Sequence, residues 1–299
     1  MKISSLLILI ALVSCSSKKD TQGTEAPSGV TNESFKKEKV LKTAEIEDFY
    51  PVGVKSLNPA LEDETLDRYT SGELEKLSDS TDPLLQLSLK CISGQYEEAF
   101  EAASKMFNRY QKLATYWNQI ANCHLNNGAY RKALLFYNKA LEVSPNYVPA
   151  LNNIGVMYSR QGLHQKAQVA FERAFKQSKF SKTPRYNLAR IYLTFGLADQ
   201  ALPLFQGLLN SSPSDIDLLN AVGSSQYLLG DYQKAMNSFA KIPQEEWSKA
   251  EIGLNIAMSY KKLGRDKDAQ KIFLNVDKPK SDELKRYYAS IGKLLGDNE

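Results

Sequence analysis

Histidine and cysteine are scarce in this chain, which has two histidines and three cysteines among 299 residues. No set of these residues with carboxylates shows the spacing of a metal site. The sequence also lacks a phosphate-binding glycine loop and a nucleophile elbow. We therefore expect no metal, no other cofactor and no enzymatic activity.

Long apolar runs and an excess of one charge are lacking as well. The apolar stretch at residues 3–13 is too short to span a bilayer but has the length of a signal-peptide core. The chain has 38 basic and 34 acidic side chains, a formal net charge of +4, which becomes +3 if cleavage removes Lys2. So small and scattered a surplus indicates no nucleic-acid partner.

What the chain does have is a strict period of 34 residues. An alanine follows each phased glycine by five residues, which gives Gly94, Gly128, Gly162, Gly196, Gly230 and Gly264 with Ala99, Ala133, Ala167, Ala201, Ala235 and Ala269. A period this strict predicts a stack of equal structural units, an architecture that favours binding over chemistry.

Each unit has the pattern of two helices. Apolar residues at three- to four-residue intervals precede each phased glycine, as in an amphipathic helix. The glycine ends that helix because the chain must enter a left-handed conformation, and a second helical run follows, such as Tyr130 to Val143. Small residues such as Gly155 indicate close helix approach, and aromatics such as Phe171 fill larger gaps. Such a hairpin cannot cover its own apolar face, so it must stack on its neighbours.

The second unit carries nearly a whole family signature, with Trp117, Gly128, Tyr130, Ala133, Tyr137 and Pro145. On these residues the pattern resembles the tetratricopeptide repeat (TPR) family, in six repeats over residues 80–277. The resemblance implies an all-α, right-handed superhelical solenoid of helix-turn-helix units. Residues 281–295, within a terminal segment 278–299, are expected to form a capping helix.

Some residues depart from the repeat pattern. Ala103 stands where the first unit needs a large aromatic, and Gln226 and Pro243 interrupt the pattern of the fifth unit. The repeat pattern therefore does not predict the local packing of these two units. His124 and His164 both fall at tyrosine positions of the repeat. We interpret both histidines as packing residues.

The N-terminus indicates a compartment. After Met1-Lys2 and the apolar core, Leu12 to Cys15 resembles the lipobox of bacterial lipoproteins, which implies removal of residues 1–14 and lipidation of Cys15. The residue after Cys15 is Ser16 rather than aspartate, and in this respect the chain resembles lipoproteins that are passed on to the outer membrane. The alternative is an ordinary secretory signal with an incidental cysteine. Residues 15–42 have the composition of a flexible tether, and residues 43–79 contain pieces that fit short capping helices but receive no role.

Two cysteines remain after lipidation, Cys91 and Cys123. They stand at neighbouring heights on the first helices of consecutive repeats. An exported compartment permits a disulfide, but register does not show whether the two Cβ atoms face each other. We expect two buried free thiols, with the disulfide as the alternative.

The first helix of each unit builds the concave wall of such a solenoid. Its predicted exposed stripe consists of Asn118, Asn122, Asn126, Asn152, Arg160, Tyr186, Arg190, Asn220, Ser224, Tyr227 and Lys261. Amides bond a partner's backbone and tyrosines give contact area, so this stripe predicts a groove for an extended peptide or partner helix. The alternative is that asparagine is common here in the family regardless of ligand. The cationic positions of the family's carboxylate clamp hold Asn118, Thr183 and Asn187, so we expect no clamp.

These features together predict a non-enzymatic scaffold or adaptor for protein partners. The lipobox places it on a membrane of the bacterial envelope, at the outer membrane and facing the periplasm. The resemblance to TPR lipoproteins implies a role in the assembly of an envelope machine such as a pilus or secretion system. The alternative is an adaptor or cofactor of an envelope protease or peptidoglycan hydrolase.

Overall fold

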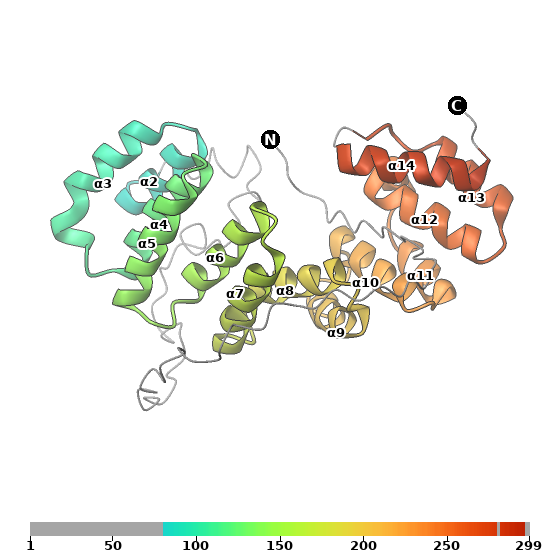
Figure 1. The fold of residues 1–299 in the computed structure, drawn as a ribbon, viewed down its shortest axis with the longest axis horizontal. Helices are drawn as coiled ribbons and strands as arrows, with labels where there is room; N and C mark the ends of the chain where they lie inside the picture. The colour runs from blue at the N-terminus through green and yellow to red at the C-terminus, as the bar shows by residue number, and fades with distance from the viewer. Residues whose placement is uncertain (1–79, 280–281, 297–299) are drawn as a thin grey trace, which may run out of the picture. The chain divides into compact units, whose positions relative to one another are not determined.

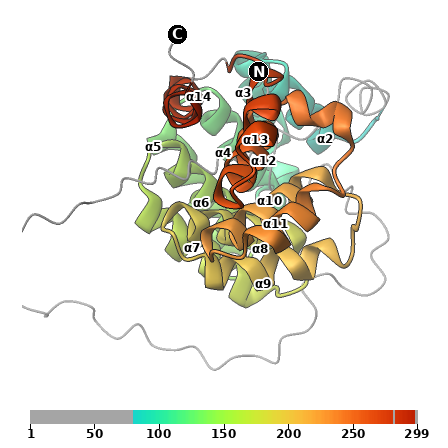
Figure 2. The same cartoon turned by 90° about the vertical axis from the view of Figure 1, so that its right-hand side faces the viewer.

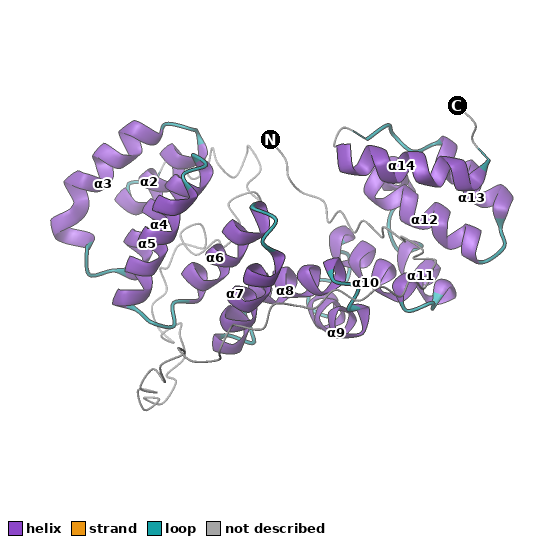
Figure 3. Cartoon of the chain, viewed as in Figure 1, coloured by secondary structure: helices purple, strands orange, loops and turns teal. Residues whose placement is uncertain are grey.

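The computed structural model describes residues 80–279 and 282–296. The predicted signal peptide, Cys15, the tether and the segment 43–79 lie outside the described residues. Within the described ranges every regular element is a helix and none is a strand (Figure 3). The α-helices are α2 (Pro83–Ile92), α3 (Tyr96–Tyr110), α4 (Ala114–Asn126), α5 (Tyr130–Val143), α6 (Val148–Arg160), α7 (His164–Gln177), α8 (Lys182–Thr194), α9 (Ala198–Leu209), α10 (Ile216–Leu228), α11 (Tyr232–Phe239), α12 (Ala250–Lys262), α13 (Asp266–Leu274) and α14 (Asp282–Leu295).

The helices pack as consecutive hairpins, from α2 with α3 to α12 with α13 (Figure 1). First helices also contact the next first helix, as in α2 with α4, α4 with α6, α6 with α8 and α10 with α12. This confirms the predicted all-α solenoid of stacked helical hairpins. This direct contact between first helices is weaker between α8 and α10, and α10 contacts the preceding unit through α9. No helix in the described ranges is long and apolar enough to cross a bilayer.

The phased glycines end the first helices as predicted. All six have φ between 72° and 82°, a region that strains any residue with a side chain. After α4, Gly128 donates its N–H to the Leu125 carbonyl at 3.1 Å, and Ala129 donates to the His124 carbonyl at 2.8 Å. These two bonds satisfy carbonyls that the helix end leaves free. The 34-residue period is therefore a period of helix ends.

Close approach within a hairpin is visible at Gly155 and Gly223. A Cβ at Gly155 would lie 2.5 Å from the ring of Phe171, and one at Gly223 would lie 2.5 Å from the ring of Phe239. The aromatic side chain thus occupies the space that the missing Cβ leaves. This confirms the prediction that small and aromatic residues interlock the paired helices.

In the fifth and first units, which depart from the repeat pattern, the helix ends and hydrogen bonds differ from those of the other units. Helix α11 ends at Phe239, before Pro243, and a 3-10 turn, η2 (Gln244–Ser248), leads into α12. Gln226 accepts a hydrogen bond from the Ser238 hydroxyl at 2.7 Å. In the first unit the Tyr116 hydroxyl of the next repeat donates to the carbonyl of Ala103 at 2.8 Å. A neighbouring aromatic therefore packs at the position where the first unit lacks its own.

The helix expected near the C-terminus is present as α14, which lies beside α12 and α13 (Figures 1 and 2). Its buried side is formed by Leu284, Tyr287, Ile291 and Leu295. Leu294, next to Leu295 in the sequence, is exposed. The Gln270 side-chain amide donates to the Leu295 carbonyl at 2.7 Å and fixes the end of α14 on α13.

The expectation of two free thiols is wrong. Cys91 on α2 and Cys123 on α4 form a disulfide, with their Cα atoms 4.9 Å apart. The physical reason is that equivalent helices of consecutive units pack directly on each other, which brings the two Cα atoms within the usual disulfide range. The bond fastens the first repeat to the second.

Candidate partner-binding surface

Asparagines link consecutive first helices along a buried seam. The Asn153 side chain on α6 donates to the Oδ1 atoms of Asn118 at 3.2 Å and Asn122 at 3.0 Å on α4. The same pairing recurs from Asn187 to Asn152 at 3.0 Å and from Asn255 to Asn220 at 3.1 Å. In each recurring pair the donor stands 35 residues after the acceptor. We call this set of hydrogen-bonded amides the asparagine seam.

The exposed stripe predicted from the sequence is therefore partly wrong. Its buried members are Asn118, Asn122, Asn152, Asn220, Ser224 and Tyr227. The amides in this set face the next first helix, where they bond to asparagines that the prediction did not include. The predicted stripe did not include Asn153, Asn187 and Asn255, because it follows the 34-residue period, whereas the seam pairs residues 35 apart. That offset was readable in the sequence.

The seam is tied into each hairpin as well. The Tyr137 hydroxyl on α5 donates to Asn122 Oδ1 at 2.6 Å, and burial raises the pKa of Tyr137. Near the other end of the row, burial and then the neighbouring Tyr232 raise the pKa of Tyr227 to about 12. Two buried groups, Asn118 Nδ2 and the Tyr227 hydroxyl, have no hydrogen-bond partner among the described residues. Polar atoms of the first helices thus serve mainly to align the stack.

The remaining predicted residues are reachable from solvent. Arg160 and Arg190 are exposed, while Asn126, Tyr186 and Lys261 are half-buried. Arg160 donates to Asn126 Oδ1 at 3.5 Å, and Lys261 pairs with Asp266 at 3.0 Å.

Helix α8 differs from its neighbours at two seam positions. In the 34-residue period, Tyr186 and Arg190 stand where α4 has Asn118 and Asn122. The helix that follows, α10, offers Ala221 at the position of the donor asparagine, so the seam is interrupted there. The Arg190 guanidinium instead lies 6.0 Å from the ring centroid of Tyr186, within range of a cation–π contact. We call Arg160, Tyr186 and Arg190 the α6–α8 surface.

Both histidines contact aromatic rings. His124 stacks on Phe100 and Phe136, with ring centroids 4.3 and 5.1 Å apart, which confirms its packing role. Burial, with the charge of Lys132, lowers the pKa of His124. His164 meets Phe195 edge-on at 6.5 Å. No group of three potential metal-ligating side chains occurs in the part of the chain that the structure describes.

Family models identify the repeats. Three models of the tetratricopeptide repeat match residues 114–147, residues 136–169, and residues 153–216 with 186–250. Residues 114–250 are therefore tetratricopeptide repeats, a module that mediates protein–protein interaction and assembly. Scaffold and adaptor proteins built from this repeat are generally non-catalytic.

Curated relatives share parts of the chain. Photosystem I assembly protein Ycf3 of Cyanophora paradoxa is 38% identical over 94 residues, which are 29% of this chain and 54% of that protein. Anaphase-promoting complex subunit 3 of Schizosaccharomyces pombe is 26% identical over 123 residues, which are 41% of this chain and 18% of that protein. The chain thus spans about half or less of these relatives.

Solved structures share the fold. The Pseudomonas aeruginosa protein pilF superimposes with a TM-score of 0.58 at 19% identity, over 73% of this chain and 99% of pilF. YrrB, described as a TPR protein with an unusual peptide-binding site, gives a TM-score of 0.52 at 21% identity, over 58% of this chain and 90% of YrrB. At these identities the likeness establishes the solenoid fold alone.

Proposed function

We propose that this protein is a non-enzymatic scaffold, lipid-anchored through Cys15 in the bacterial envelope, that holds a protein partner during assembly of an envelope machine. The lipid would fix it to the outer membrane with its repeats facing the periplasm. The α6–α8 surface is the part of the first-helix row that we assign to the partner.

One observation carries the assignment of the surface. Along the seam, asparagines of the first helices form hydrogen bonds between repeats. On α8, Tyr186 and Arg190 stand at the positions that Asn118 and Asn122 hold on α4. Arg190 and Arg160 are exposed, and tyrosine and arginine dominate the binding energy of protein interfaces. The asparagine seam of the preceding repeats holds the first helices that carry these side chains in register.

Two further observations support the scaffold role and the compartment. Relatives that share these repeats are named for an assembly process or as subunits of a multiprotein complex, as Ycf3 and anaphase-promoting complex subunit 3 are. The Cys91–Cys123 disulfide favours an oxidising compartment, because thiols in the cytosol are usually kept reduced. An exported protein agrees with the lipobox at Cys15.

The partner is tested by crosslinking and pull-down from membranes. We expect Arg160→Ala/Arg190→Ala to lose partner proteins that the wild type captures. The matched control is Lys132→Ala/Lys176→Ala, which removes two exposed cations from the second helices α5 and α7. Retention of every partner by the first variant, or equal loss in the control, would remove the α6–α8 surface from the proposal.

The anchor is tested by detergent phase separation. Each buried CH₂ of an acyl chain contributes about 0.8 kcal/mol, so a lipidated Cys15 holds the protein in the detergent phase. We expect Cys15→Ser to move the protein to the aqueous phase and Ser17→Ala to leave it in detergent. A wild-type mature chain recovered without lipid would refute the anchor.

A further inference from the structure

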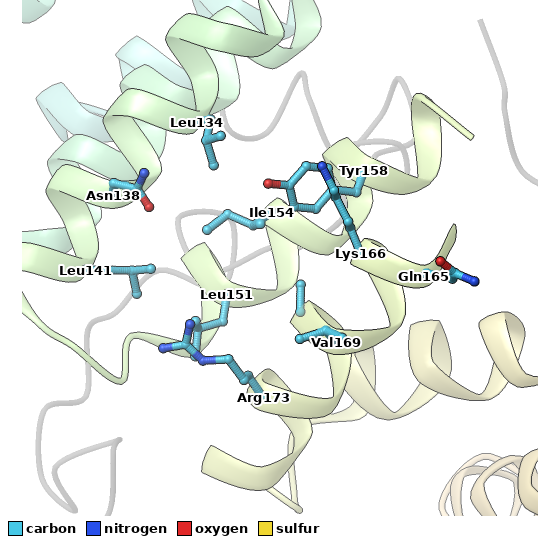
Figure 4. Close-up of a pocket in the computed structure, with 11 residues that line it drawn as sticks. Leu134, Asn138, Leu141, Leu151, Ile154, Tyr158, Gln165, Lys166, Val169 and Arg173 are labelled. Atoms are coloured by element: carbon cyan, nitrogen blue, oxygen red, sulfur yellow. The ribbon is translucent and has the colours of Figure 1, made fainter. Parts of the chain in front are cut away.

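A groove lies between the second helices α5 and α7, with α6 as its floor (Figure 4). Its volume is about 500 Å³, within the range of about 300–1,000 Å³ typical of ligand pockets. No side chain of the α6–α8 surface lines it. We call it the α5–α7 groove.

The groove has the length of two helical turns. On α5 it extends from Leu134 to Leu141, and on α6 from Leu151 to Tyr158. Both pairs are seven residues apart, which corresponds to about 10 Å along a helix. Leu151 and Ile154 on the floor are buried, while Leu134 and Leu141 on the α5 wall are half-buried. The groove is thus an apolar trough that matches two turns of a helix lying in it.

One wall of the groove is basic. Lys166 and Arg173 stand seven residues apart on α7, and no lining residue is acidic. Neither cation forms an ion pair with a described residue, although Lys166 lies 5.6 Å from the Tyr158 ring centroid. Between the two cations Val169 is 59% exposed and adds an apolar surface to this wall.

The nearest carboxylate on α7 does not cancel this charge. Glu172 Oε1 accepts hydrogen bonds from Gln168 at 2.7 Å and from the Tyr192 hydroxyl of α8 at 3.4 Å. Its carboxylate is therefore engaged on the α8 side, away from the groove lining. The α5–α7 groove keeps an apolar floor beside two cations with a defined spacing.

We propose that the α5–α7 groove binds a two-turn amphipathic helix of a partner protein. Apolar side chains at positions i, i+3 or i+4 and i+7 of that helix fill the trough above Leu151 and Ile154. Two carboxylates about seven residues apart face Lys166 and Arg173, since that spacing repeats the separation of the two cations. This surface is additional to the α6–α8 surface, so one molecule joins two partners.

The probe is a fluorescein-labelled helical peptide of about 16 residues, long enough for measurable helicity. It carries leucines at i, i+3, i+4 and i+7 and two glutamates seven residues apart, and its anisotropy is followed as the full chain in detergent is added. We expect Val169→Glu and Arg173→Glu each to weaken binding about tenfold or more, because each places a repelling charge at the centre or edge of the contact.

Matched controls separate this site from general effects. Leu135→Glu adds a carboxylate at an equally exposed apolar residue of α5, 55% exposed, outside the lining. Lys176→Glu reverses an exposed cation of α7 outside the lining. Both should leave the affinity within about twofold, as substitutions outside the contact do. A second peptide with lysines in place of the glutamates should bind Arg173→Glu more tightly than the wild type.

Three results would overturn the proposal. The glutamate peptide fails to bind the wild type, or Leu135→Glu weakens it as much as Val169→Glu does. In the third, light scattering shows a self-associated wild-type chain that Val169→Glu, but not Leu135→Glu, converts to a monomer. The occupant of the groove is then a second copy of this chain.

Discussion

Substitution of Asn153 tests how much the asparagine seam contributes to the free energy of unfolding. Asn153→Ala removes the donor of two hydrogen bonds, to Asn118 and Asn122, from a buried site between α4 and α6. Asn122 Oδ1 keeps its bond from Tyr137, whereas Asn118 Oδ1 has no second donor among the described residues and is left buried without one. The perturbation therefore combines lost bonds with one uncompensated acceptor.

The expected magnitude follows from these two contributions. The lost bond to Asn122 costs about 1 kcal/mol and the orphaned acceptor of Asn118 costs about 1–3 kcal/mol, so Asn153→Ala should lower the free energy of unfolding by about 2–4 kcal/mol. Asn118→Ala should cost less, about 1 kcal/mol or below, because it also removes an amide nitrogen that is buried without a partner. Asn118→Ala and Asn153→Ala each remove one partner of the same hydrogen bond, but their effects on the free energy of unfolding should differ clearly.

Urea unfolding followed by far-UV circular dichroism measures this difference. Asn108→Ala on the exposed side of α3 is the control, and it should change the free energy of unfolding by less than about 0.5 kcal/mol. The double variant Asn118→Ala/Asn153→Ala should show coupling of about 1 kcal/mol. Equal costs for Asn118 and Asn153, or no coupling, would show that the seam does not hold the repeats together.

Three further outcomes are expected. Gly223→Ala should cost about 1–3 kcal/mol because its Cβ meets the Phe239 ring, and a thermal melt unchanged from the wild type would contradict the interlocked hairpin. Cys91→Ser/Cys123→Ser should lower the free energy of unfolding by about 4 kcal/mol, since the disulfide closes a loop with a sequence separation of 32. A urea midpoint that changes neither with the double substitution nor with added reductant would contradict this. The raised pKa of Tyr227, about 12, means that its neutral form is favoured on folding. Its contribution is present below pH 10 and is lost as pH rises toward 12, so Tyr227→Phe should reduce alkaline unfolding measured by circular dichroism.

The period was enough to predict the fold because it depends on local chemistry. A helix end that needs positive φ selects glycine wherever it occurs, and Gly128 and its equivalents all adopt that conformation. The pairing of Gly155 with Phe171 was also readable, since a small residue in one helix and an aromatic in the next recur at fixed positions. These signals lie within one unit.

Contacts between units were harder to predict. A helix has about 3.6 residues per turn, so an error of one residue turns the predicted face by about 100°. The predicted stripe placed Asn118 and Asn152 on the partner-facing side, whereas they are buried and bond to the next first helix at an offset of 35 residues. The disulfide and the α5–α7 groove depend on the distance and direction between neighbouring units, which a repeat pattern does not encode.

Site-specific photocrosslinking at position 186 in intact cells tests the central claim most directly. A photoreactive residue in place of Tyr186 should yield discrete protein adducts, because this side chain lies on the α6–α8 surface. The adducts should disappear with Arg160→Ala/Arg190→Ala, and the same probe at position 274 on α13 should not form them. No adduct at position 186, or the same adducts at both positions, would contradict a scaffold that grips its partner on the first helices.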